Sequence, residues 1–273
     1  MALPIALQLY SVRDYLEKDF EGTLRRVKEL GYEGVEFAGL YGHEYEEVRK
    51  LLDEVGLAAV SAHVPLDDLL ADLDGVLKGY QTIGCRYIAL PWSSEEYRPG
   101  GEKFEALIEQ AKVVGAAAPK YGITLLYHNH DFEFVPLGDK LGLDVLYESV
   151  PAELLQTELD TCWVSVAGQD APSYVRQYTG RAPVVHLKDF LLAGQKPLRL
   201  YELIGVDDEA AEEEPVGTFE FRPLGKGMLN VPAVLEAAAE AGAYWVVVEQ
   251  DQPSLGLTSL ECVAESLRYL KAL

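Results

Sequence analysis

The sequence predicts a single α/β domain over residues 1–273, folded as a (β/α)8 TIM barrel with an insertion between strands seven and eight. Three observations lead to this fold. A unit made of an amphipathic helical stretch, a glycine and a short β-branched or aromatic run recurs along the chain. Eight strand candidates follow one another, most of them roughly 24 to 37 residues apart, which is the usual size of a βα unit. The first strand is not followed by the Gly-x-Gly-x-x-Gly signature of an open dinucleotide-binding sheet.

The recurring unit accounts for the elements in order. Apolar side chains such as Phe20, Leu24 and Val27 recur with helical spacing and predict helices with one buried face. A glycine after such a stretch adopts positive φ just beyond the helix and turns the chain into a buried strand. The glycines in this position are Gly31, Gly56, Gly84, Gly122 and Gly242. The strand candidates are 5–10, 35–37, 59–61, 87–90, 124–127, 155–160, 183–189 and 244–248.

One interval is irregular, because roughly 55 residues separate the seventh and eighth strand candidates, far more than a plain connection needs. It contains acidic runs at 207–209 and 212–214. The loop that leaves a barrel strand lies on the C-terminal face, so we expect the insertion, about 191–230, to lie beside the active site and close over the substrate. The segment Gly225-Lys226-Gly227 lacks the spacing of a phosphate-binding loop and is interpreted as a turn.

Composition and charge exclude several classes of protein. Hydrophobic residues make up 49% of the chain, which is too many for a disordered protein. The formal charge of -22 disfavours nucleic acid and anionic membrane surfaces as partners. The N-terminus has no signal-peptide pattern, and no apolar run is long enough to cross a bilayer. Cys85, Cys162 and Cys262 are isolated, which argues against a disulfide framework and favours a reducing cytoplasm.

Polar side chains gather where the predicted strands end. Side chains two residues apart share one face of a strand, as His128 and His130 do, and also His186 and Lys188. The strand ends of a barrel meet at one rim, where barrel enzymes keep their chemistry. Two imidazoles and two carboxylates from four consecutive strands suit one divalent ion, Mn, Co, Zn, Fe or Mg, with open positions for substrate. The predicted ligands are His128, Asp160, His186 and Glu249, and a hydrogen-bonded polar rim is the alternative.

Four motifs, in matching order, resemble those of the xylose-isomerase-like barrels, the sugar phosphate isomerase/epimerase family, and the resemblance covers essentially the whole chain. They are Tyr127-His-Asn-His-Asp-Phe-Glu-Phe134, Leu159-Asp-Thr-Cys-Trp163, His186-Leu-Lys-Asp189 and Val248-Glu-Gln-Asp251.

The resemblance implies a divalent ion, with manganese favoured, that binds adjacent oxygens of a keto-sugar or polyol. It gives Asp160, His186 and Glu249 the second, third and fourth ligand places. The first place departs from the pattern, because many members read Glu-Asn-His where this chain reads His128-Asn129-His130. An imidazole at position 128 cannot be assumed to share acid–base work with the eighth-strand glutamate.

Further residues are expected around the metal. We expect Glu249 to be the primary base, with Lys188, His130 or Glu133 as the second proton-transferring group. A salt bridge for Lys188 and a solvated loop for His130 and Glu133 are equal alternatives.

Some residues are expected to contact the sugar itself. Glu36 and His63 end the second and third strands and are predicted to bind its hydroxyls, although hydrogen bonds within the barrel rim explain them as well. Trp163 follows the sixth strand and is predicted to stack on a sugar ring, whereas Trp92 is assigned to core packing.

The leading hypothesis is a metal-dependent isomerase or epimerase that acts on a keto-sugar or related polyol through a metal-stabilised enolate. The closest alternative is an inosose-dehydratase-like lyase, which expels water from the same intermediate, and a catalytically silent sugar-binding barrel is a third. The absence of an arginine cluster and the acidic charge favour a neutral carbohydrate over a sugar phosphate. The predicted partner is therefore a small carbohydrate, and a homo-oligomer is left open.

Overall fold

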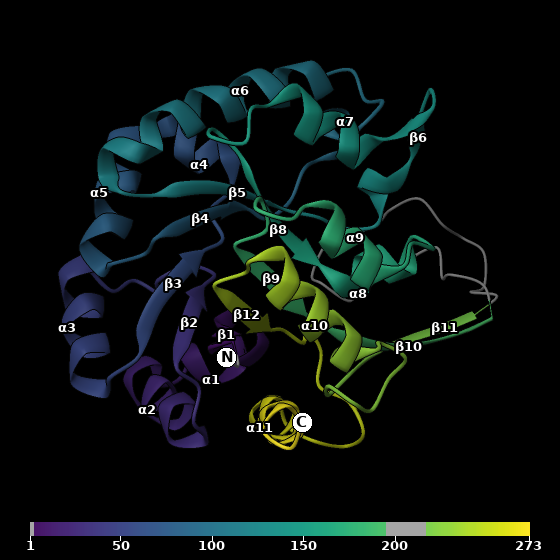
Figure 1. Ribbon diagram of the computed structural model, residues 1–273. Helices are drawn as coiled ribbons and strands as arrows, with labels where there is room; N and C mark the ends of the chain where they lie inside the picture. The colour runs from purple at the N-terminus through teal and green to yellow at the C-terminus, as the bar shows by residue number, and fades with distance from the viewer. Residues whose placement is uncertain (1–2, 195–216) are drawn as a thin grey trace.

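The computed structural model describes residues 3–194 and 217–273 and confirms the predicted barrel. Eight parallel strands form one sheet in the order β3-β2-β1-β12-β9-β8-β5-β4, and helices lie on its outer side (Figure 1). The ring closes between β3 and β4 through a single bridge from His63 to Ala89, where Val64 N–H donates to Ala89 O at 3.0 Å. The barrel strands are β1 (Ile5–Gln8), β2 (Gly34–Phe37), β3 (Ala58–Ala62), β4 (Tyr87–Leu90), β5 (Thr124–His128), β8 (Gln156–Asp160), β9 (Val184–Leu187) and β12 (Trp245–Val248).

The outer layer consists of helices that pack an apolar face on the strands. In α2, for example, Phe20, Leu24 and Val27 are buried as their spacing predicts. The helices are α1 (Arg13–Leu16), α2 (Phe20–Leu30), α3 (Tyr45–Val55), α4 (Leu66–Ala71), α5 (Leu73–Ile83), α6 (Phe104–Ala117), α7 (Gly142–Ser149), α8 (Thr161–Val166), α9 (Ala171–Gln177), α10 (Val231–Ala241) and α11 (Ser259–Leu270). Short 3-10 segments occupy Leu9–Val12, Glu95–Tyr97, Ala118–Tyr121 and Phe132–Phe134. None of the helices in the described ranges has the length and apolarity that a membrane crossing requires.

The helix-terminating glycines behave as predicted. All five predicted positions lie directly after a helix with φ between 69° and 105°, in the left-handed region that a side chain rarely adopts. Two strands end two residues earlier than predicted. The first strand ends at Gln8, because the Gln8 side chain accepts a hydrogen bond from Tyr10 N–H and starts a 3-10 turn. The seventh ends at Leu187, and Asp189 already belongs to another strand.

The interior of the barrel is divided into an apolar floor and a polar upper part. The floor is a separate cluster of small and branched side chains, namely Ala6, Val60, Ala89, Leu126, Val184 and Val247. Two residues further along four of these strands the inward position is polar: Gln8 follows Ala6, His128 follows Leu126, His186 follows Val184 and Glu249 follows Val247. The chemistry of the molecule therefore lies on an apolar plug at the C-terminal ends of the strands.

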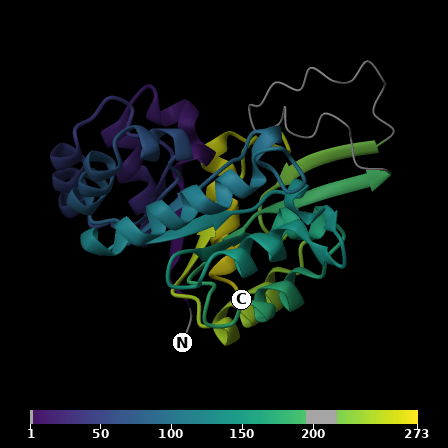
Figure 2. The ribbon, with the colours of Figure 1, turned by 90° about the horizontal axis from the view of Figure 1, so that it is seen from above.

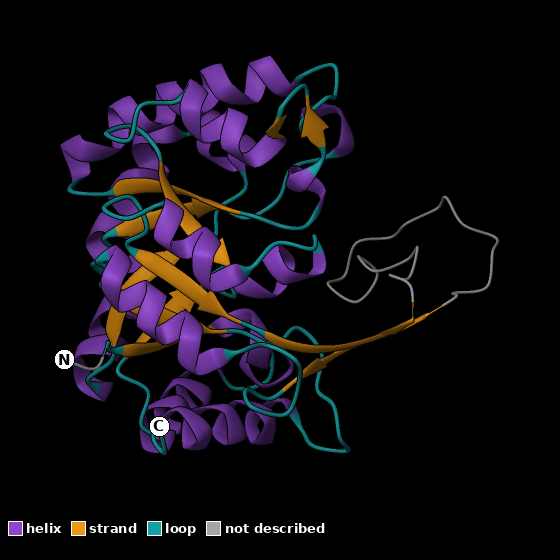
Figure 3. Ribbon diagram, turned by 45° about the vertical axis from the view of Figure 1, so that its right-hand side comes forward, coloured by secondary structure: helices purple, strands orange, loops and turns teal. Residues whose placement is uncertain are grey.

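Part of the predicted insertion is an antiparallel ribbon of β10 (Asp189–Gly194) and β11 (Gly217–Arg222). Figures 2 and 3 show it extending away from the barrel. The acidic runs at 207–209 and 212–214, and with them the predicted closure over the substrate, lie outside the described residues. A smaller hairpin, β6 (Pro136–Leu137) with β7 (Lys140–Leu141), follows β5.

The predicted turn at Gly225 to Gly227 wraps around the carboxylate of Asp189. Asp189 accepts the backbone N–H groups of Phe190, Gly225, Gly227 and Leu229, each at 2.9 to 3.0 Å. A Cβ at Gly227 would lie 2.2 Å from Asp189 Oδ1, so only glycine allows this close approach. The turn holds an internal anion, which agrees with the prediction that it is no phosphate-binding loop.

We therefore expect Asp189→Ala to lower the free energy of unfolding by about 2–4 kcal/mol, because several backbone N–H groups lose their acceptor together. Asp189→Asn, which keeps one acceptor oxygen, should lose less. Urea denaturation followed by circular dichroism measures both. Asp19→Ala is the control, because Asp19 accepts one exposed N–H at the start of α2 and should cost about 1 kcal/mol. Equal losses for Asp189→Ala and Asp19→Ala would contradict this account.

Candidate metal centre and substrate pocket

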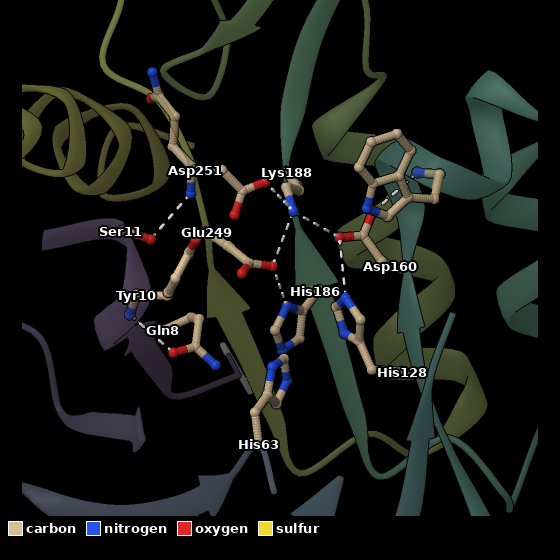
Figure 4. A network of polar contacts seen from close by, with 12 residues as sticks. Gln8, Tyr10, Ser11, His63, His128, Asp160, His186, Lys188, Glu249 and Asp251 are labelled. Atoms are coloured by element: carbon tan, nitrogen blue, oxygen red, sulfur yellow. Dashed lines mark hydrogen bonds and ion pairs between the residues drawn. The ribbon is translucent and has the colours of Figure 1, made fainter. Parts of the chain in front are cut away.

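A pocket of about 440 Å³ opens at the C-terminal ends of the strands, above the polar part of the barrel. One wall is polar and includes His128, His130 and Lys188, and the other is formed by Pro65, Pro91 and Trp92. The remaining lining residues are Tyr10, Ala38, Gly39, His63, Asp68, Glu249 and Asp251. Figure 4 shows the polar side chains pointing toward one another from neighbouring strands.

The structure brings together the four predicted metal ligands. They lie at the C-terminal ends of β5, β8, β9 and β12: His128 and Asp160 are the last residues of their strands, His186 is the last but one, and Glu249 directly follows its strand. Each offers a donor atom within 4.8 Å of the others. His186 Nδ1 lies 3.0 Å from Glu249 Oε2, and His128 Nε2 lies 3.9 Å from Asp160 Oδ2. All four side chains are buried. This is a mixed nitrogen and oxygen set of the kind that binds divalent transition metals.

Local structure orients Asp160. Its Oδ1 accepts Trp163 N–H at 3.0 Å and so caps α8, which directs the other oxygen inward. The Asn129 side chain accepts Asp160 N–H at 3.0 Å and ties the end of β8 to the loop after β5. Burial raises the pKa of Asp160 to about 6, so the carboxylate is costly unless a positive charge lies beside it. Asp160 Oδ2 has no hydrogen-bond partner in the described ranges, as expected for an atom reserved for a cation.

The two imidazoles in this set differ in their charge. Burial, reinforced by the neighbouring His186, lowers the pKa of His128 well below its usual value, which leaves the neutral form that binds metals. Burial alone would lower the pKa of His186 too, but Glu36, Glu158 and Glu249 outweigh it and raise that pKa. Without an ion, His186 therefore carries the charge that balances its carboxylate neighbours.

Lys188 lies at the centre of a carboxylate cluster and is 2% exposed. Its Nζ lies 2.6 Å from Asp251 Oδ2, 3.2 Å from Glu249 Oε2 and 3.7 Å from Asp160 Oδ2. Burial alone would lower the pKa of Lys188, but these carboxylates outweigh it and raise that pKa. The side chain therefore stays an ammonium ion and does not act as a base.

A second layer of charged groups lies directly below this set. Glu36, predicted to bind sugar hydroxyls, is fully buried and does not line the pocket. Its Oε1 accepts Gln8 Nε2–H at 2.7 Å and lies 2.8 Å from His186 Nε2. His63 does line the pocket, but its Nε2 faces Glu158 Oε2 at 2.7 Å. Glu36 thus lies within β2 and out of the pocket, and hydrogen bonds within the barrel rim, the alternative to sugar binding, describe it.

Glu133 is also corrected by the structure. It is fully buried, and its two oxygens accept Tyr127 O–H and His130 N–H, each at 2.8 Å. Burial raises the pKa of Glu133 to about 7. The carboxyl group fixes the loop that carries His130, whose imidazole reaches the pocket. Burial lowers the pKa of His130, so the ring is neutral.

The two tryptophans exchange the roles predicted for them. Trp163 is fully buried, with Lys188 Nζ 5.3 Å from its ring and the Phe219 ring stacked at 6.0 Å, so no sugar can lie on it. Trp92 is partly exposed, lines the pocket and meets the His130 ring edge-on at 4.8 Å. Trp92 lies in the loop after β4 and Trp163 in the first turn of α8, both beyond the strands, so strand periodicity offered no signal to separate them.

Several pocket residues were not assigned a role from the sequence. Asp251 follows Glu249 on the same strand face, and this spacing was its only signal. Tyr10 follows the first strand and has Arg13 4.0 Å from its ring. Asp68 lies in α4, the helix that follows β3, and no periodic pattern in the sequence indicates that it faces the pocket.

Comparisons with known proteins agree with this geometry. An inosose dehydratase of Clostridium perfringens strain 13 is 24% identical over 278 residues, which covers 93% of this chain and 90% of the relative. A solved sugar phosphate isomerase/epimerase of Parabacteroides distasonis superposes with a TM-score of 0.76 at 22% identity, covering 100% of this chain and 94% of that one. The IOLI protein, solved with a bound zinc atom, gives 0.66 at 15% identity and covers 97% and 96%. The model of the xylose isomerase-like TIM barrels matches residues 24–273, and the chain belongs to that family.

Proposed function

We propose that this protein is a divalent-metal-dependent dehydratase that removes water from an uncharged keto-polyol of the inosose type. The observation that carries the proposal is the meeting of four metal-ligand donors with an ammonium ion and a neutral imidazole in one pocket. The Clostridium relative named inosose dehydratase supports the reaction class. From the sequence alone an isomerase or epimerase ranks first; we place the dehydratase first because this relative supports it.

The residues present fit a divalent ion. Asp160 Oδ2 is buried without a hydrogen-bond partner in the described ranges, and the donor set is two imidazoles and two carboxylates. His128, Asp160, His186 and Glu249 would hold the ion, and manganese suits this balance of nitrogen and oxygen donors. Bound there, the ion supplies Lewis-acid polarisation of a substrate carbonyl, which acidifies the neighbouring C–H group.

The proton-transfer roles follow from the neighbours of each group. Glu249 is poorly placed as the primary base, because its Oε2 already faces His186 Nδ1 and Lys188 Nζ. His130 is neutral, lines the pocket and is held by Glu133, so it is the better base for the proton next to the carbonyl. Lys188 has protons to donate and is the acid that protonates the departing hydroxyl group. The C–H proton thus passes to His130, and the hydroxyl leaves as water.

The pocket lining favours an uncharged substrate. Among the described residues that line the pocket, Lys188 is the only lysine or arginine, and it is already surrounded by carboxylates. Asp68, Glu249 and Asp251 add negative charge, which opposes a phosphate group. Trp92 and the two prolines offer an apolar wall for the C–H face of a ring.

An isomerase or epimerase is the second candidate. The solved sugar phosphate isomerase/epimerase of similar fold supports it, and both reactions begin with loss of the same proton. They differ in the next step, because isomerisation returns a proton to carbon whereas dehydration expels a hydroxyl group.

Metal binding is the first test of this function. We expect the purified protein to bind about one manganese ion per chain and Asp160→Asn to weaken this binding about 100-fold or more, because a ligand is lost. Asparagine still caps α8, so the fold should be retained. Asp170→Asn is the matched control, since Asp170 caps α9 away from the pocket. Isothermal titration measures the affinity, and no binding by the wild type would refute the proposal.

His130→Gln tests the assigned base. We expect kcat to fall about 100- to 10,000-fold, the usual contribution of general acid–base catalysis, with manganese affinity unchanged. His43→Gln is the control, because His43 is an exposed histidine outside the pocket. If His130→Gln keeps full activity while Glu249→Gln abolishes it without loss of metal, Glu249 is the base.

The fate of the substrate separates the two reaction classes. Manganese-loaded protein is incubated with inososes and neutral keto-sugars in deuterated water, and NMR and ultraviolet spectra are recorded. Loss of water and an absorbing enone or dione are expected for the dehydratase. Deuterium next to the carbonyl with the product mass otherwise intact would identify an isomerase or epimerase instead. If these compounds bind and none of these changes occurs, the protein is a catalytically silent sugar-binding barrel.

A further inference from the structure

A second group of metal-ligand donors lies one layer below the proposed catalytic site. It consists of His63, His128, Glu158 and His186, whose donor atoms also lie within 4.8 Å of one another. His63 directly follows β3, His128 ends β5, and Glu158 and His186 lie within β8 and β9. Figure 4 shows the His63, His128 and His186 rings gathered beneath Glu249 and Lys188.

Three donor nitrogens lie within 3.5 Å of one oxygen of Glu158. Glu158 Oε2 lies 2.7 Å from His63 Nε2, 3.3 Å from His128 Nδ1 and 3.5 Å from His186 Nε2. In a tetrahedral zinc site with bonds of about 2.0–2.1 Å, neighbouring ligand atoms lie about 3.3 Å apart. The distances from Glu158 Oε2 to the three nitrogens, 2.7 to 3.5 Å, therefore fall around the ligand–ligand spacing of a zinc coordination shell.

Two of these nitrogens have no hydrogen-bond partner. His128 Nδ1 and His186 Nε2 are buried, and within residues 3–194 and 217–273 neither makes a hydrogen bond of acceptable geometry. Glu36 Oε1 does lie 2.8 Å from His186 Nε2, but the two groups are not aligned as donor and acceptor. Buried polar atoms are nearly always satisfied, so a pair of them aimed at one carboxylate points to an ion between them.

We propose that His63, His128, Glu158 and His186 form a second cation position, selective for zinc, below the catalytic one. Three imidazoles and one carboxylate suit zinc better than manganese, which prefers more oxygen ligands. Glu158 and His186 are fully buried, so the position leaves no room for substrate. The charges of Glu158 and the adjacent Glu36 together equal that of one divalent ion. The inference rests on the proposed function, because both positions use His128 and His186.

Because both positions use His128 and His186, they cannot both hold an ion at the same time. The upper position uses His186 Nδ1, which faces Glu249, and the lower one uses His186 Nε2, which faces Glu158. A neutral imidazole has one nitrogen that accepts and one that carries a proton, so it binds one ion at a time. Zinc in the lower position therefore withdraws two ligands from manganese. We expect zinc to inhibit the manganese enzyme by competing with the metal and not with the substrate.

The test separates the layers with one variant in each. Glu158→Gln changes the lower layer, Asp160→Asn the upper one, and His63→Gln gives a second lower-layer variant if Glu158→Gln fails to fold, as judged by circular dichroism. Manganese binding is followed by electron paramagnetic resonance, zinc affinity by competition with a chromophoric chelator, and the zinc ligands by X-ray absorption. In wild type we expect zinc to displace manganese and to show three imidazole ligands.

Opposite effects of the two changes are the expected result. The lower-layer variant should lose zinc affinity about 100-fold and keep manganese within a fewfold, whereas Asp160→Asn should lose manganese and keep zinc. If Asp160→Asn weakens both metals and the lower-layer variants weaken neither, the second position is wrong and the catalytic site stands. If the lower-layer variants weaken both metals equally, Glu158 and His63 only support the upper ligands. If wild type binds neither metal, the proposed function fails together with this inference.

Discussion

The structure depends on how negative charge is tolerated inside a closed barrel. Five carboxylates, those of Glu36, Glu158, Asp160, Glu249 and Asp251, are at most 5% exposed and face one another at the strand ends. Carboxylates at these distances are stable only beside positive charge. Lys188 supplies one cation and touches three of them from above. The remaining negative charge is balanced by the histidines or by a bound ion, and the polar groups at the rim are arranged around this balance.

The apolar floor gives this charge cluster its sharp boundary. Ala6, Val184 and Val247 occupy the same inward faces as the polar residues two positions further on. Water therefore has no route to the carboxylates from below, and their interactions are strengthened by the low dielectric. The rigid ring of strands keeps the donor atoms within a few ångströms before any ligand arrives, which is the preorganisation that a metal site and a polar active site both require.

Rules that act over a few residues predicted most of the fold and the proposed metal ligands. Helix-terminating glycines and period-two alternation located all eight strands and placed His128, Asp160, His186 and Glu249 on one rim, because both rules act over a few residues. These rules could not predict contacts between strands that lie apart in the ring. Glu36 meets His186 only because the strands curve and the sheet closes, and neither residue's neighbours encode that meeting. Trp92, Trp163 and Glu133 all lie beyond the ends of the strands, where the period-two rule no longer says which side chain reaches the pocket.

The histidine at position 128 links the two layers. A glutamate there, as in many xylose-isomerase-like barrels, would add a further negative charge beside Asp160 and Glu249 and would point one donor group at the upper layer. An imidazole removes that charge and has two nitrogens on opposite sides of its ring, one 3.9 Å from Asp160 and the other 3.3 Å from Glu158. While the His128 imidazole binds a metal, it is not free to act as a base. Proton transfer is therefore assigned to His130. A histidine in place of a glutamate at position 128 thus accounts for the proposed lower cation position and for the assignment of the base to His130.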